Sequence, residues 1–184
     1  MLGDLLEDEP GSSIPPAART MFRTMLDLLE ELNDRIGDLD REIARRARED
    51  VIARRLMTIP GVGPITATAI AALAPPAETF AKGRDFAAWL GLAPRQLLTG
   101  GKQKLGSISK MGERTLRRLL IIGCSAVVLQ ASKRVAPKGS WLQQMLARKP
   151  RMLVTVALAN KTARIVWALL VRNEDYKAPV AAAA

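Results

Sequence analysis

Three hydroxyl side chains in one basic, glycine-rich segment are the candidate nucleophiles of this sequence. Thr99, Ser107 and Ser109 lie within RQLLTGGKQKLGSISKMG, at residues 95–112. A hydroxyl becomes an effective nucleophile only when a base, a positive neighbour or a metal ion activates it. The chain contains no histidine, which excludes Ser-His-Asp and Cys-His catalysis and the common zinc arrangements. Activation would therefore come from lysine or arginine neighbours, or from a metal held elsewhere.

The surroundings of two of these hydroxyls differ. Thr99 lies beside Gly100 and Gly101, which is an exposed place for a reactive group. Ser109 also has a structural explanation, because a helix expected from about Lys110 would use it as its N-cap.

Acidic residues are too scarce in the C-terminal two-thirds of the chain to build a metal site. Residues 51–184 hold only five Asp and Glu, and Glu78, Asp85 and Glu113 show no helical pairing. Two-metal phosphoryl chemistry cannot be built from this part alone, so we expect no metal or other cofactor to be bound by the chain. Cys124, the single cysteine, lies in an apolar run and is expected to be a small core residue.

Charge is distributed unevenly along the chain. Residues 1–50 hold 13 acidic and 7 basic residues, a net charge of −6, whereas residues 51–184 hold 5 and 21, a net charge of +16. A segment this basic is expected to attract polyanions, although a basic protein without such a partner is an alternative. The single cysteine favours a reducing cytoplasm, and the acidic start is not a secretory signal. No apolar stretch approaches the length of a membrane span, so no membrane partner is expected.

The basic, glycine-rich segment is also suited to binding phosphates. Glycines let the backbone approach a phosphate closely, and lysine or arginine then supplies the charge. The spacing of GGKQK does not match the phosphate-binding loop of nucleotidases, which argues against an ATPase. The residues expected to contact nucleic acid here are Arg95, Gly100, Gly101, Lys102, Lys104, Ser109 and Lys110.

The turn IPGVGP, with Gly61, Val62 and Gly63 at its centre, predicts a helix-hairpin-helix. Such a turn can point backbone N–H groups outward at the start of the second helix and hold a DNA phosphate without reading sequence. The alternative is a tight turn between two helices that needs glycine for its backbone angles alone.

Three arginines share one side of the helix expected after Lys110. They are Arg114, Arg117 and Arg118, and only Glu113 nearby is acidic. This pattern indicates a face that grips a nucleic-acid backbone, while a solvated helix face is the alternative.

The apolar pattern predicts an all-α protein with a long N-terminal helix and a helical C-terminal domain. Apolar residues spaced by four and three from Met25 to Ile43 form a heptad seam, which fits a coiled coil or an amphipathic helix lying on its own domain. The expected parts are a flexible lead-in (1–16), the long helix (17–58), the C-terminal domain (59–175) and a disordered tail (176–184). Within the domain we expect helices over 65–73, 110–131, 140–147 and 151–172, a short helix capped by Asp85, and a hairpin or ordered loop over 95–112.

Three segments in order, IPGVGPITATAIAAL, FAAWLGLAPRQ and TGGKQKLGSISKMGERTLRRLLIIG, resemble one family. They are similar to the C-terminal domain of the insertion-sequence transposases named for IS110, IS116 and IS902. The resemblance covers about residues 56–131. It implies an enzyme of DNA transposition and recombination that is bacterial, cytoplasmic and nucleoid-associated, with DNA and a structured guide RNA as partners, and that acts as a homo-oligomer.

The resemblance also implies a mechanism. Members of the family carry an N-terminal RuvC-like domain whose DEDD acidic set binds Mg²⁺, while the C-terminal domain supplies a serine that forms a covalent protein–DNA ester. In that register the serine position is Thr99 here, and the RuvC-like domain is expected to be missing, which would leave the chain incomplete as an enzyme. The alternatives are a non-catalytic helix-hairpin-helix nucleic-acid-binding protein and a regulatory transposase fragment.

Overall fold

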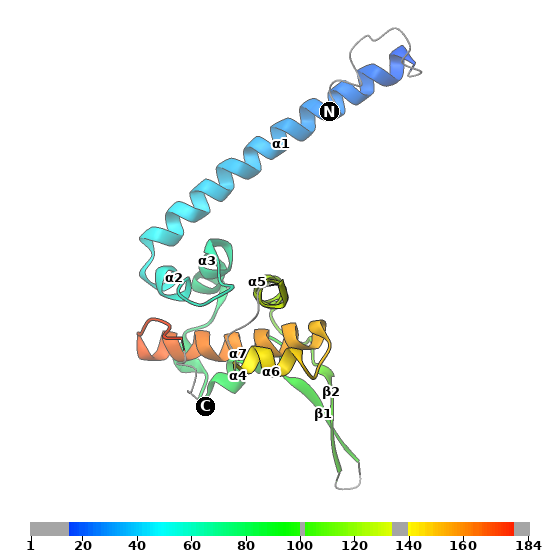
Figure 1. Cartoon of the computed structure of the whole chain (residues 1–184). Coiled ribbons are helices and arrows are strands. Elements are labelled where there is room, and N and C mark those ends of the chain that lie inside the picture. Colours follow the sequence, from blue (N-terminus) through cyan, green and yellow to red (C-terminus); the bar gives the residue numbers. More distant parts are fainter. Residues whose placement is uncertain (1–14, 100–101, 134–139, 179–184) are drawn as a thin grey trace. The chain divides into compact units, whose positions relative to one another are not determined.

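A computed structural model describes residues 15–99, 102–133 and 140–178 of the chain (Figure 1). The chain divides into two compact units, Met1–Ala44 and Arg45–Ala184. The described residues are mainly helical, which confirms the helical class, but they also contain two short strands that an all-α description leaves out. Residues 1–14 of the expected lead-in and residues 179–184 of the expected tail lie outside the described residues.

The long N-terminal helix α1 spans Pro16–Glu49 and does not continue to residue 58 as expected. Asp50 ends it and caps a separate helix α2, Val51–Leu56, because its side chain accepts a hydrogen bond of 2.9 Å from the backbone N–H of Ala53. Ala53 and Leu56 are fully buried. The second compact unit starts at Arg45, within α1.

Two further helices follow the IPGVGP turn. Helix α3 spans Pro64–Leu73, a short 3₁₀ turn η2 spans Ala77–Thr79, and helix α4 spans Gly83–Trp89. Asp85 was expected to cap α4, but it lies inside the first turn of this helix. There its carboxylate accepts a hydrogen bond from the N–H of Lys82 (3.1 Å). On the buried face of α4, Phe86 stacks on Trp89 and meets Phe80 edge-on.

The segment 95–112 forms a hairpin, one of the two structures expected for it. Strand β1, Pro94–Thr99, pairs antiparallel with strand β2, Lys102–Ile108. Helix α5, Arg114–Lys133, begins four residues later than expected, because Lys110 and Gly112 both take positive φ values that a helix does not allow. Ser109 is therefore not its N-cap.

The core of the second unit is built around helix α5 and the last long helix, α7, Arg151–Arg172, with the short helix α6, Trp141–Leu146, beside them. Cys124 is buried in this core, as expected, with its Sγ 3.5 Å from the hydroxyl of Thr162, and burial raises the pKa of its thiol. By length and composition alone, helices α5 and α7 are long and apolar enough to cross a membrane, whereas no apolar stretch of that length was expected from the sequence. In this fold they pack against each other and bury apolar faces between them.

Candidate nucleic-acid interface

The IPGVGP turn joins α2 to α3 and lies against α5. Gly61 has a left-handed backbone (φ +85°), and a Cβ built on it would lie 2.9 Å from the carbonyl oxygen of Gly123. Val62 is buried, and its N–H donates to the carbonyl of Ile59 (3.0 Å). The structure therefore gives Val62 a packing role and leaves neither its side chain nor its N–H for a phosphate.

Gly63 is the part of this turn that is open to a ligand. It is exposed, and a Cβ added to it would meet no atom within 4 Å. It also caps α3, whose first intrahelical hydrogen bond runs from Ala67 N–H to the Gly63 carbonyl. The N–H groups of the first helical turn have no acceptor within a helix, so the exposed start of α3 offers donors to an anion.

The hairpin carries the candidate nucleophile at its end. Thr99 is the last residue of β1 and pairs with Lys102, and Leu97 pairs with Lys104. Figure 1 shows the two strands running out from the helices of this unit. Gly100 and Gly101, which connect the strands, lie outside the described residues. The backbone pairing thus places Thr99 close in space to one of the lysines expected to bind phosphate.

Hydrogen bonds tie the base of the hairpin to the end of α4. Arg95 donates from Nη2 to the carbonyl of Ser109 (3.1 Å), and Ser109 donates from its N–H to the carbonyl of Ala93 (2.9 Å). The N–H of Lys110 donates to the carbonyl of Gly91 (3.1 Å). Ser109 is therefore a connecting residue of the hairpin base, and Arg95 and Lys110 are held beside it.

The first turns of α5 extend this basic cluster. Arg117 donates from Nη1 to the carbonyl of Leu90 (3.0 Å) and is partly buried, so it anchors α5 to the end of α4. Arg114 and Arg118 are exposed and form no ion pair within the described residues. Of the three arginines, Arg114 and Arg118 are therefore the two whose guanidinium groups are open to a partner.

Glu113 is the acidic residue next to these arginines. Its carboxylate accepts a hydrogen bond of 2.7 Å from the N–H of Thr115. This hydrogen bond lowers the pKa of Glu113, and the charge of Arg117 adds a smaller effect in the same direction. Because the folded pKa is lowered, the cap stabilises the helix at neutral pH and is lost as the pH falls through that value.

The predicted residues do not form one continuous surface. Gly61 contacts Gly123 on α5, whereas Arg114 and Arg118 lie about 140° to 180° away from Gly123 around the helix axis, at about 100° per residue. One group consists of Arg95, Ser109, Lys110 and Arg117, which hydrogen bonds hold beside the end of α4, together with Arg114 and Arg118 in the first turns of α5. The IPGVGP turn lies on another side of α5. We name the first group the hairpin-base cluster: Arg95, Ser109, Lys110, Arg114, Arg117 and Arg118.

The described residues include no group of three or more acidic or cysteine side chains that could hold a metal ion. The Mg²⁺ implied by the family resemblance therefore does not fit this part of the chain.

Comparison with known proteins identifies the family. Residues 53–138 match the model of the transposase family IS116/IS110/IS902, a stretch that includes the IPGVGP turn, the hairpin and α5. The matched part of the chain belongs to this transposase family. The match begins inside α2 and contains every residue of the hairpin-base cluster.

Relatives of the chain carry transposase names. It is 46% identical over 177 residues to a probable family 20 transposase of Pseudomonas aeruginosa, covering 96% of this chain and 52% of that protein. It is 41% identical over 137 residues to the transposase for insertion sequence element IS1328 of Yersinia enterocolitica, covering 74% of this chain and 41% of that protein. The transposase for IS1111A of Coxiella burnetii is 35% identical over 164 residues, covering 89% and 45%. The chain spans about half the length of these relatives.

One group of basic residues in this transposase-family chain was not predicted from the sequence. Arg84 on α4 and Lys161 and Arg164 on α7 line a groove together with two tryptophans. No motif marks them, but Lys161 and Arg164 are three residues apart on a mainly apolar helix, so they share a face. This spacing could have been recognised in the sequence, whereas the contact between α4 and α7 could not.

Proposed function

We propose that this chain holds nucleic acid for an insertion-sequence transposase, and that the hairpin-base cluster is the surface that does so. The observation that carries the proposal is the pair Arg114 and Arg118, exposed and without an ion pair in the described part of the chain. Exposed guanidinium groups on a rigid helix neutralise phosphates and release counterions. The family and the names of the relatives support a DNA partner.

The same proposal assigns strand cleavage to the hydroxyl of Thr99. Its oxygen bonds to a DNA phosphorus atom, a sugar oxygen leaves with the proton, and a covalent protein–DNA ester results. In this proposal an acidic, Mg²⁺-binding domain of the kind that the family resemblance implies completes the site, and a structured guide RNA is a further partner. Support comes from the position of Thr99 at the end of a hairpin whose base is lined with arginine and lysine.

The binding surface is tested by removing the two exposed arginines. We expect Arg114→Gln/Arg118→Gln to weaken binding to duplex DNA about tenfold or more, because each lost charge removes a charge-assisted phosphate contact. Fluorescence anisotropy with a labelled duplex measures the affinity. The matched control, Arg172→Gln/Lys177→Gln, removes the same charge from exposed residues at the end of the described chain. Equal losses in both variants would contradict the proposal.

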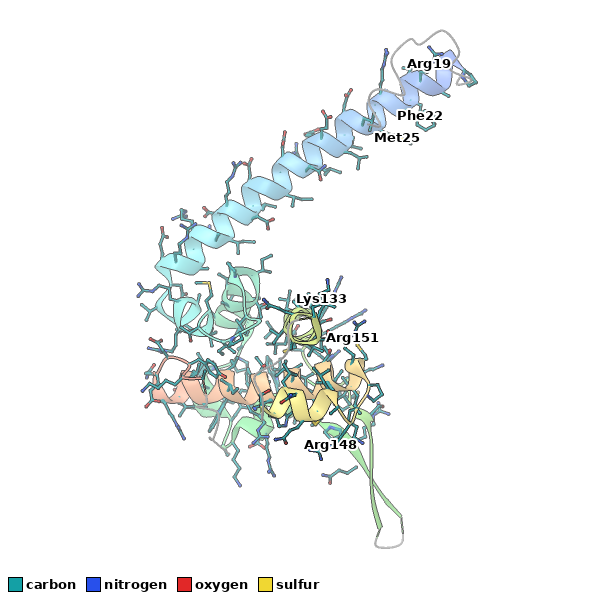
Figure 2. All side chains as sticks on the ribbon, viewed as in Figure 1. Arg19, Phe22, Met25, Lys133, Arg148 and Arg151 are labelled. Carbon is teal, nitrogen blue, oxygen red and sulfur yellow. The ribbon has the colours of Figure 1, made fainter. Side chains whose placement is uncertain are left out.

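A second part of the proposal is that α1 forms a parallel two-stranded coiled coil with another copy. The seam residues Met25, Leu29, Leu32, Ile36 and Leu39 are all exposed in the single chain, and Figure 2 shows the side chain of Met25 near the start of this seam. Isoleucine at one seam position and leucine at the next, as in Ile36 and Leu39, favours parallel dimers.

Charge on α1 favours the parallel arrangement. Arg35 and Asp40 flank the seam at positions that contact each other across a parallel pair, whereas an antiparallel pair centred on this region would bring Arg35 against its own copy. Arg35 also bonds Glu31 within the helix (2.5 Å), and that exposed pair contributes little on its own.

Sedimentation tests the coiled coil. We expect the chain to sediment as a dimer and Leu32→Asn/Leu39→Asn to sediment as a monomer, because two polar residues on each helix would then interrupt the seam. Asp34→Asn, on the opposite side of the helix, should remain dimeric. A monomeric unmodified chain at high concentration would overturn this part of the proposal.

A further inference from the structure

A groove of about 820 Å³ lies between the start of α4, helix α6 and the middle of α7. Its walls are held in place by direct contacts. Trp167 donates from Nε1 to the carbonyl of Ala77 (3.0 Å), and a Cβ added to Gly83 would lie 3.2 Å from the carbonyl oxygen of Arg164. The groove is therefore formed before any ligand arrives, and its volume falls within the range of ligand sites, roughly 300–1,000 Å³.

The groove is lined by positive and not by negative charge. Lys82, Arg84, Lys161 and Arg164 line it, and no acidic side chain in the described part of the chain does so. None of the four makes an ion pair with a described residue. Basic side chains along a concave, low-dielectric wall concentrate their field in the groove and favour an anion there.

Trp141 supplies an aromatic surface in the same groove. It is the first residue of α6, whose N-cap Ser140 accepts a hydrogen bond from the N–H of Gln143 (3.2 Å), and it is 36% exposed. The ammonium group of Lys161 lies 4.7 Å from its ring centroid. A tryptophan held at a fixed place beside lysine and arginine is the combination on which bases of single strands stack.

We propose that this groove binds an unpaired segment of nucleic acid, with a base stacked on Trp141 and its phosphates held by Arg84 and Arg164. This inference rests on the proposed nucleic-acid function. It gives the chain a second binding surface, which shares no residue with the hairpin-base cluster. A duplex keeps its bases stacked inside, whereas an unpaired base can enter a groove and reach a tryptophan ring. The ligand is therefore a single strand, of DNA or of RNA.

The test compares single-stranded and duplex ligands with the whole chain. Fluorescence anisotropy with labelled oligothymidylate and oligouridylate measures the affinity of the chain for single strands. The affinity for a labelled duplex is measured in parallel. We expect Trp141→Ala to lower single-strand affinity about tenfold, Trp141→Phe to retain most of it, and both to leave duplex affinity unchanged. Thermal unfolding of each variant checks that the fold is kept.

Salt dependence separates a phosphate contact from a structural role. We expect Arg84→Gln/Arg164→Gln to reduce the slope of log Kobs against log salt for oligothymidylate by about 1.4, or about 0.7 per lost contact. The control Arg172→Gln/Lys177→Gln removes the same charge outside the groove and should leave the slope unchanged. The relative affinities for oligothymidylate and oligouridylate show which sugar the groove accepts.

Three results would overturn the proposed binding of single strands in the groove. The groove variants could bind single strands like the unmodified chain while Arg114→Gln/Arg118→Gln loses duplex binding. That result would refute the groove as a binding site and support the hairpin-base cluster. If Trp141→Ala weakens binding to single strands and to duplex equally, the groove is not selective for unpaired bases. An unmodified chain that binds neither ligand would refute the groove and the proposed function together.

Discussion

Replacing Gly123 with alanine is expected to lower the free energy of unfolding of the second unit by about 3 kcal/mol. A Cβ on Gly123 would stand 1.9 Å from the carbonyl oxygen of Gly61, a distance at which backbone must move. Gly61 cannot simply retreat, because its positive φ and its own contact with α5 fix the turn. Alanine gains about 1 kcal/mol in helix propensity, and the overpacking outweighs this gain.

Circular dichroism during heating and in urea measures the effect, and the melting temperature should fall by roughly 10 °C. Gly63→Ala is the matched control in the same turn, since an added Cβ there meets no atom within 4 Å. We expect the control to lower stability by less than about 1 kcal/mol. Equal stability of the two variants would show that the turn does not pack on α5 as described.

Replacing Thr99 with alanine is expected to abolish the covalent protein–DNA adduct while leaving DNA binding intact. Removing a nucleophile eliminates the bond-forming step, whereas the phosphate contacts come from other residues. Thr99→Ser should form the adduct faster than the unmodified chain, because a primary hydroxyl approaches phosphorus with less hindrance. End-labelled DNA and denaturing electrophoresis detect the adduct, with the acidic domain of a longer relative supplied in trans.

The outcomes of this experiment also separate the alternative functions. Ser107→Ala is the control, because it removes another hydroxyl of the same hairpin outside the proposed role. If the covalent adduct still forms in Thr99→Ala, Thr99 is not the nucleophile. DNA binding without adduct in the unmodified chain and in Thr99→Ser would favour the non-catalytic binding protein.

Local patterns in the sequence predicted the later helices well. Pro150 and the apolar period after Arg151 define α7, and Ser140 before Trp141 defines the start of α6 through its N-cap hydrogen bond. The end of α1 was missed because the apolar pattern continues through Asp50. The capping preference of Asp50 was the local signal that marked the break.

Features that depend on tertiary contact could not be predicted. Lys110 adopts a left-handed backbone, which lysine rarely takes, and this displaced the start of α5. The separation of the IPGVGP turn from Arg114 and Arg118 follows from the packing of Gly61 on Gly123. The groove is assembled from α4, α6 and α7, so its charges become neighbours only after folding.

The central claim is that the exposed basic residues beside the hairpin exist to hold a sugar–phosphate backbone. The salt dependence of duplex binding by the unmodified chain tests it most directly. If Lys110, Arg114 and Arg118 each neutralise one phosphate, log Kobs should fall linearly with log salt with a slope of about −3 or steeper. A slope near zero, or no binding to duplex DNA in dilute buffer, would contradict the claim.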